Sequence, residues 1–184
     1  MITFPDNSSP KLIEMITTGS VGVLLTDTLY GLVAKADNEA AVERVFAIKG
    51  RDTTKPPIVL VASVEQLYDP LPRGIDETVG GMWPGKNSII MPASSAPAWL
   101  VRGSSGVAYR VPDNAGLRRL LEQTGPLIAP SANPEGEAPA RSVGEAEGYF
   151  GEQVDFYVDG GVAFESQPSR LYSMTGSGDL EQLR

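Results

Sequence analysis

The 184-residue chain carries 15 basic and 23 acidic residues, which gives a formal net charge of −8, and it contains no cysteine and no histidine. These counts exclude disulfides, cysteine nucleophiles, Ser-His-Asp triads and metals bound by histidine or thiolate, so a metal would need oxygen ligands. The negative charge argues against strong non-specific binding of nucleic acid, and length and composition predict one soluble domain over residues 1–184.

The first half of the chain alternates between apolar runs and helix signals. The N-terminal stretch MITFPDNSSP is no signal peptide and no apolar run reaches membrane-spanning length, so we expect a cytoplasmic protein without a membrane partner. Ser9-Pro10 predicts the start of a helix, and residues 21–25 predict an internal strand. Asn38 is predicted to cap a second helix that ends near Gly50, before a strand at 58–62.

The second half continues the alternation. Ser63 with Gln66 predicts a capped short helix, while residues 70–85 are rich in proline and glycine and can be placed only coarsely. Asp113 is predicted to cap a helix that ends at Gly125, and Ser142 to cap a later one. Strands are predicted at 88–91, 107–111, 127–129, 154–158, 170–174 and 180–183. This pattern predicts a mixed α/β domain.

Three cations fall close together between the second helix and the strand that follows it. The stretch KGRDTTKPP contains Lys49, Arg51 and Lys55. Arginine supplies a two-pronged donor and lysine a point charge, so this spacing fits a loop that wraps around phosphates. The alternative is a solvated cationic helix C-terminus, which the helix dipole favours in any protein. The segment alone leaves both interpretations open.

Two other segments offer neutral hydrogen-bonding groups at the ends of predicted strands. The stretch TDTLYG carries Thr28, and the stretch PSAN carries Ser131 and Asn133. Each is either a loop that faces a ligand or an ordinary polar turn. Arg110, near the end of an apolar strand, either meets a ligand carboxylate or pairs with a local acidic residue.

Taken together, these segments resemble the YrdC-like family of threonylcarbamoyl-AMP synthases. Each motif is weak alone, whereas the set in this order across nearly the whole chain is specific. The resemblance implies a short, single-domain α/β (α+β) form with a twisted, mixed parallel and antiparallel sheet, flanking helices and a concave ligand pocket. The matching motifs are TDTLYG at 26–31, KGR at 49–51, Lys55-Pro56, WPG at 83–85, RVP at 110–112, PSAN at 130–133, Pro168-Ser169 and Leu183-Arg184.

The resemblance also implies a reaction. L-Threonine and bicarbonate or carbon dioxide form an N-carboxylate, which attacks the α-phosphate of ATP to give threonylcarbamoyl-AMP and pyrophosphate. Positioning and charge neutralisation dominate such a reaction, which suits a chain without histidine. Mg²⁺ is expected to arrive with ATP. The product serves formation of threonylcarbamoyladenosine in tRNA, so downstream tRNA threonylcarbamoyl-transferase proteins are expected partners.

Residue roles follow from the same match. The resemblance implies that Lys49 and Arg51 are catalytic and that no protein side chain binds a metal. Threonine is expected to contact Thr28, Arg110 and Ser169, with its carboxylate on Arg110. The implied nucleotide-binding residues are Lys49, Arg51, Lys55, Ser131, Asn133 and Arg184.

The chain departs from the family's usual motifs on the substrate side and at the end of the nucleotide site. Family members usually have proline where Leu25 stands, and threonine where Arg170 stands. WPG is followed here by Lys86, Asn87 and Ser88, where a proline or small residue and then threonine are usual. The sequence stops at Arg184, where relatives usually continue with Pro-Gly.

Two other functions stay open at this point. One is a carbamoyl-adenylate-forming domain of the carbamoyltransferase type, which would use carbamoyl phosphate without threonine. The other is a non-catalytic RNA-binding module, against which the net charge of −8 argues.

Overall fold

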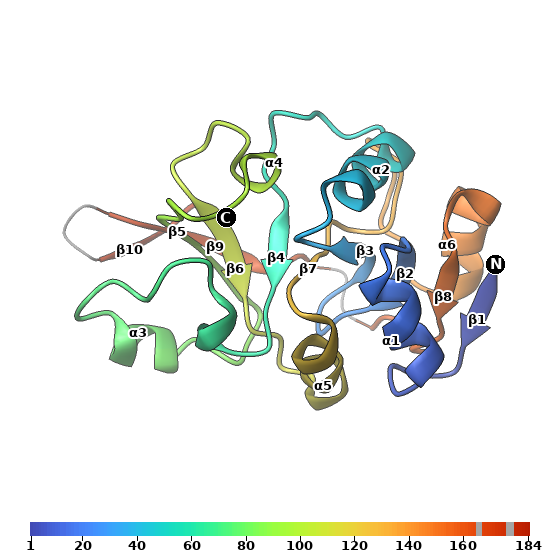
Figure 1. Cartoon of the computed structure of the whole chain (residues 1–184), viewed down its shortest axis with the longest axis horizontal. Helices are drawn as coiled ribbons and strands as arrows, with labels where there is room; N and C mark the ends of the chain where they lie inside the picture. The colour runs from blue at the N-terminus through green and yellow to red at the C-terminus, as the bar shows by residue number, and fades with distance from the viewer. Residues whose placement is uncertain (165–166, 176–178) are drawn as a thin grey trace.

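The computed structural model describes residues 1–164, 167–175 and 179–184, and the described strands form a ten-stranded sheet (Figure 1). The strand order is β1-β8-β2-β3-β7-β4-β6-β5-β9-β10. The strands are β1 Ile2–Phe4, β2 Gly22–Leu25, β3 Tyr30–Lys35, β4 Ile58–Leu60, β5 Asn87–Met91, β6 Val107–Arg110, β7 Leu127–Ile128, β8 Phe156–Val158, β9 Arg170–Met174 and β10 Leu180–Gln182.

Helices flank this sheet, and its strand pairing is mixed. Parallel pairs join β1 to β8, β8 to β2, β4 to β6 and β5 to β9, while the remaining neighbours pair antiparallel. The predicted mixed α/β fold is therefore confirmed. The helices are α1 Pro10–Thr17, α2 Glu39–Lys49, α3 Asp76–Gly80, α4 Ala98–Val101, α5 Ala115–Thr124 and α6 Val143–Phe150, with 3₁₀ turns at Val64–Gln66 and Gly151–Gln153.

The two faces of the sheet pack against different helices. In β4, Val59 belongs to the core that contains α2 and α6, whereas Leu60 belongs to the core that contains α1 and α5. This alternation follows from the two-residue period of a strand, which sends successive side chains to opposite faces. Figure 1 shows α2 above and α5 below the central strands. No helix in the described ranges combines the length and apolarity needed to cross a membrane.

Side-chain caps were predicted with mixed success. Asn38 accepts a hydrogen bond from the Ala41 amide at 3.0 Å, and Ser142 accepts one from the Glu145 amide at 3.2 Å, so both predicted caps are confirmed. The predicted cap at Asp113 was wrong, because the next residue, Asn114, caps α5.

Two further caps and several elements also differ from the prediction. Ser9 and Ser63 precede helical turns but make no side-chain cap bond, and Gln66 instead accepts from the Ala62 amide at 2.8 Å. The sequence patterns missed β1, β3, α3 and α4. Strand β3 was missed because its first residue, Tyr30, was taken as part of a turn, whereas it pairs with Leu25 across a tight connection.

Gly22 in β2 provides a test of this packing. A Cβ atom at position 22 would lie 2.3 Å from the ring of Phe156 in the adjacent strand β8, and that ring is fully buried. We therefore expect Gly22→Ala to lower the free energy of unfolding by about 1–3 kcal/mol, as overpacking does in other cores.

The matched control is Gly148→Ala on the exposed side of α6, where an added methyl group meets nothing within 4 Å. Alanine favours a helix over glycine, so this variant should raise the free energy of unfolding by about 0.5–1 kcal/mol. Urea unfolding followed by tryptophan fluorescence measures both. Equal unfolding midpoints for the two variants would show that the Gly22–Phe156 contact has been misplaced.

Candidate active site

A cavity of about 130 Å³ opens where the turn between β2 and β3, the loop after α2 and the chain after β7 meet. Pockets for drug-sized ligands measure roughly 300–1,000 Å³, so this cavity fits a ligand of about amino-acid size. It is lined by six of the nine residues that the sequence put forward, namely Thr28, Arg51, Arg110, Ser131, Ser169 and Arg184.

The strand directions explain how these distant segments meet. Strands β2 and β7 both run antiparallel to β3, and β4 runs antiparallel to β7, so β2 and β7 end at the edge where β4 begins. Arg110 ends β6, which is parallel to β4, and therefore comes from the opposite edge. The β2–β3 turn reaches it, because Asp27 contacts both Arg110 and the amide of Asp113.

Thr26 organises the β2–β3 turn, and both Thr26 and Thr28 are buried. The Thr26 hydroxyl oxygen accepts from the amides of Thr28 and Leu29 at 3.1 and 3.2 Å, and the hydroxyl donates to the Leu29 carbonyl at 2.7 Å. The hydroxyls of Thr26 and Thr28 lie 3.1 Å apart, and both residues line the cavity.

Arg110 pairs with an acidic residue, as one of its two sequence interpretations predicts, and it also lines the cavity. Its contact with a ligand carboxylate stays a prediction. Its Nη2 lies 3.2 Å from Asp27 Oδ1, and the two side chains are only 4% and 2% exposed. Burial lowers the pKa of Arg110, while the charge of Asp27 opposes that shift. The buried Nε has no hydrogen-bond partner among the described residues. Asp27 was not among the predicted site residues, although it sits inside the TDTLYG motif.

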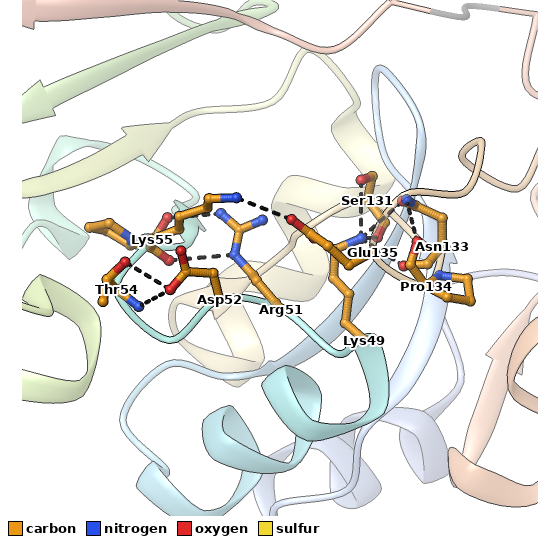
Figure 2. A network of polar contacts seen from close by, with 10 residues as sticks. Lys49, Arg51, Asp52, Thr54, Lys55, Ser131, Asn133, Pro134 and Glu135 are labelled. Carbon is orange, nitrogen blue, oxygen red and sulfur yellow. Dashed lines mark hydrogen bonds and ion pairs between the residues drawn. The ribbon is translucent and has the colours of Figure 1, made fainter.

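Lys49 lies behind the cavity wall rather than on it (Figure 2). Its ammonium group donates to the carbonyl oxygens of Ser131 and Asn133, each at 2.7 Å, and to the Asn133 side-chain oxygen at 2.9 Å. The residue is 2% exposed. Burial, together with the charge of Arg51, lowers the pKa of Lys49 to about 8, so it remains largely protonated at neutral pH. The geometry makes Lys49 a brace for the PSAN turn.

Asn133 shares this bracing role. Its side-chain nitrogen donates to the carbonyl oxygens of Pro134 at 2.9 Å and Glu137 at 2.7 Å, so both ends of the amide are occupied within the protein. The side chain is buried and lies off the cavity wall. Lys49 and Asn133 together fix the backbone of Ser131, which does line the cavity.

Arg51 and Lys55 sit differently in the same loop (Figure 2). Arg51 lines the cavity and makes only long hydrogen bonds, at 3.4 and 3.3 Å, to the carbonyl oxygens of Lys55 and Pro56. Burial lowers the pKa of Arg51. Lys55 lies off the wall and forms an exposed ion pair with Glu135 at 3.2 Å, which links the loop to the chain after the PSAN turn.

A second wall of the cavity comes from the C-terminal part of the chain. The buried hydroxyls of Ser169 and Ser88 lie 2.9 Å apart, and Arg184 donates to the Ser169 carbonyl oxygen at 3.4 Å. Arg184 is held in place through its backbone, which exchanges hydrogen bonds with Leu171. Ser88 was noted in the sequence only as a departure from the family motif, and the structure shows it directly behind Ser169.

A larger cavity of about 630 Å³ adjoins the first and shares Pro168, Ser169 and Arg184 with it. Its other walls include Lys86, Asn87 and Arg170. These residues meet because β5 and β9 pair in parallel, with Asn87 opposite Arg170. The residues at 86–88 and 170, which depart from the family motifs, therefore lie together around one wall of the larger cavity.

Positive charge dominates the smaller cavity. Among the described residues that line it, Arg51, Arg110 and Arg184 carry charge and none is acidic. No group of three or more aspartates or glutamates that could hold a metal ion occurs in the described ranges. In a chain with a net charge of −8, this concentration of guanidinium groups makes the cavity a place for an anionic ligand.

Comparison with known proteins agrees with this site. The family model described as "Telomere recombination", which covers Sua5, YciO and YrdC proteins, matches residues 14–184. The chain therefore belongs to the Sua5/YciO/YrdC family. A relative from Marinobacter nauticus, named threonylcarbamoyl-AMP synthase, is 34% identical over 178 residues, which cover 90% of this chain and 94% of the relative.

Two solved structures share the fold. Sua5 from P. abyssi, crystallised with L-threonine, superimposes with a TM-score of 0.88 and is 29% identical. That match covers 100% of this chain but 56% of the Sua5 chain. YciO from E. coli has a TM-score of 0.82 at 23% identity, covering 99% of this chain and 95% of that one, and supports the fold alone.

The bracing role of Lys49 predicts a pH dependence of stability. Because the pKa of Lys49 falls from its usual 10.5 to about 8, the folded protein releases this proton before the unfolded chain does. Between about pH 8 and 10.5 the unfolded chain binds more protons, so the free energy of unfolding should rise with pH relative to that of Lys49→Met.

Urea unfolding across this pH range measures the difference, with Lys55→Met as the control that removes an exposed lysine of the adjacent loop. A ¹³C NMR titration of the Lys49 Cε is an independent readout that needs no variant. Parallel stability curves for the parent and Lys49→Met, together with a midpoint near 10.5 in the NMR titration, would contradict the buried position of Lys49.

Proposed function

We propose that this protein is an enzyme that forms L-threonylcarbamoyl-AMP from L-threonine, bicarbonate or carbon dioxide, and ATP, with release of pyrophosphate. The observation that carries the proposal is the amino-acid-sized cavity with three guanidinium groups on its wall. Threonine, bicarbonate and ATP each present anionic oxygens that guanidinium groups bind well. The synthase names of relatives and the threonine complex of the Sua5 relative support the same reaction.

The position of threonine follows from the fixed polar groups. The ion pair with Asp27 holds the Arg110 guanidinium on the cavity wall, where it binds the substrate carboxylate. The Thr28 hydroxyl, which lines the cavity, accepts a hydrogen bond from the substrate's N–H. The Ser169 hydroxyl, backed by Ser88, lies on the same small cavity.

The proposed reaction needs little general acid or base catalysis by protein side chains. The threonine amine adds to carbon dioxide and loses one proton to water, which gives the N-carboxylate. A carboxylate oxygen then forms a bond to the α-phosphorus of ATP as the bond from that phosphorus to the pyrophosphate oxygen breaks. Arg51 and Arg184 neutralise charge on the phosphates, and Ser131 offers a hydroxyl beside them. Mg²⁺ enters as part of the ATP substrate.

The product is proposed to serve threonylcarbamoyladenosine formation in tRNA. Threonylcarbamoyl-AMP is a mixed anhydride, so a downstream transferase must carry the threonylcarbamoyl group to the tRNA adenosine. We place the reaction in the cytoplasm, where ATP, threonine and tRNA occur together.

Pyrophosphate release tests the function directly. We expect release from ATP and bicarbonate that depends on L-threonine, with formation of a labile adenylate. L-Serine and carbamoyl phosphate are the comparison substrates. Release with carbamoyl phosphate in the absence of threonine would replace the proposal with carbamoyl-adenylate formation. Salt-sensitive RNA binding without any release would instead indicate an RNA-binding module.

Arg110→Lys tests the threonine side while keeping a positive charge beside the buried Asp27. Lysine cannot form the two-pronged contact with a carboxylate, so the KM for threonine should rise about tenfold or more, with a smaller change in the KM for ATP. Steady-state kinetics with each substrate varied in turn measures the two KM values separately. Equal changes in both KM values would make Arg110 a structural residue only.

A further inference from the structure

Arg102 connects the loop that carries Arg51 to α2 and to the end of α4. It follows α4, and its side chain is 8% exposed. Its Nη1 donates to the carbonyl oxygen of Thr53, within that loop, at 3.0 Å. Its Nη2 donates to the carboxylate of Glu43, on α2, at 2.5 Å. One guanidinium group therefore ties the loop to two helices.

The same guanidinium stacks on an aromatic ring that also adjoins Arg51. The Arg102 Cζ lies 3.7 Å from the centroid of the Phe46 ring, and the Arg51 Cζ lies 5.8 Å from it. Phe46 is 2% exposed, so the ring is a fixed platform. Arg102 also lowers the pKa of Arg51, as expected for two neighbouring positive charges. Arg102 is held in turn by Glu43 and by the Phe46 ring.

The backbone at Arg102 is unusual as well. Its φ of +49° lies in the left-handed region, and Arg102 is the one non-glycine residue described there. A side chain is sterically disfavoured in that region, where glycine fits freely. An arginine at such a position indicates that its side chain performs a task that glycine cannot.

Apart from the Phe46 ring, Arg51 has only two long hydrogen bonds among the described residues to fix its position. Its two hydrogen bonds are long and go to carbonyl oxygens of its own loop, so they move with the loop rather than anchor it. Its place on the cavity wall therefore depends on what holds the loop. Arg102 supplies a contact from outside the loop through its hydrogen bond to the Thr53 carbonyl oxygen.

We propose that Arg102 is a positioning residue for the ATP side of the reaction: it fixes the 51–55 loop so that Arg51 lines the cavity. The inference rests on the proposed function, because it assigns the loop to ATP. Arg102 itself does not line the cavity, and it acts through Arg51.

Arg102→Gln is the principal variant, and Arg44→Gln is its matched control. Arg44, on α2, also bridges a carboxylate and a carbonyl oxygen, those of Asp155 and Gln153, away from the loop. We expect Arg102→Gln to raise the KM for ATP about tenfold, equivalent to about 1.4 kcal/mol, and to leave the KM for threonine within about twofold. Arg44→Gln should leave both KM values within about twofold.

Two conservative variants test the geometry of the contact. Arg102→Lys keeps the charge but cannot bridge Thr53 and Glu43 together, so it should restore ATP affinity only in part. Glu43→Gln loosens the anchor without touching the arginine and should raise the KM for ATP about threefold. It also serves if Arg102→Gln fails to fold. A KM for ATP that is unchanged in Glu43→Gln and in a folded Arg102 variant would overturn the proposal.

A double-mutant cycle shows whether Arg102 acts through Arg51. In an Arg51→Gln background, Arg102→Gln should change the KM for ATP by less than about twofold, because the group that it positions is gone. If the fold-change in the KM for ATP of the double variant equals the product of the two single-variant fold-changes, the proposal is overturned.

Hydrogen exchange supplies a readout that does not need activity. The amides of Thr54 and Lys55 bond to Asp52 within the loop, and their exchange should speed up in Arg102→Gln but not in Arg44→Gln. Unchanged exchange would contradict the positioning role.

If the parent protein releases no pyrophosphate, the proposed function fails, while hydrogen exchange and calorimetric ATP binding still test the role of Arg102. If the parent is active and the variants match it, the positioning inference alone fails.

Discussion

The buried ion pair between Asp27 and Arg110 is the contact on which the candidate site depends. It joins the β2–β3 turn to the end of β6, which lie on opposite edges of the sheet, and so closes one side of the cavity. Both charges are almost entirely shielded from water, and removing one partner from such a pair commonly costs about 3–5 kcal/mol. The buried Nε of Arg110 has no hydrogen-bond partner among the described residues.

The cations near the site divide into those that face the cavity and those that hold its walls. The ammonium group of Lys49 donates three hydrogen bonds to the PSAN turn, and Arg102 joins the 51–55 loop to α2. Arg51, by contrast, has only long bonds within its own loop and lies on the wall. A cation that makes close hydrogen bonds within the protein fixes geometry, whereas one that makes only long ones keeps donors for an anion.

Local signals predicted local structure well where one short-range contact decides the outcome. Asn38 caps α2 because its side chain reaches the amide three residues later, a distance set by the helix itself. The same reasoning chose Asp113 for α5, whereas Asn114 caps the helix and the amide of Asp113 donates to Asp27. Strand β3 was missed because its first residue, Tyr30, directly follows a tight turn and was taken as part of that turn.

The sequence by itself determined the mixed α/β fold, the family and the set of residue types around the site, because ordered motifs and apolar periodicity are properties of the chain. Only the tertiary structure decided which polar groups face the cavity. Lys49 and Arg51 are two residues apart, yet one points to carbonyl oxygens some eighty residues away and the other to the cavity. Asp27, Ser88 and Arg102 gained their roles in the same way, from partners that strand pairing and helix packing brought within reach. Hydrogen-bond partners distant in sequence leave no local pattern, so the division between bracing and binding residues appears only once the chain has folded.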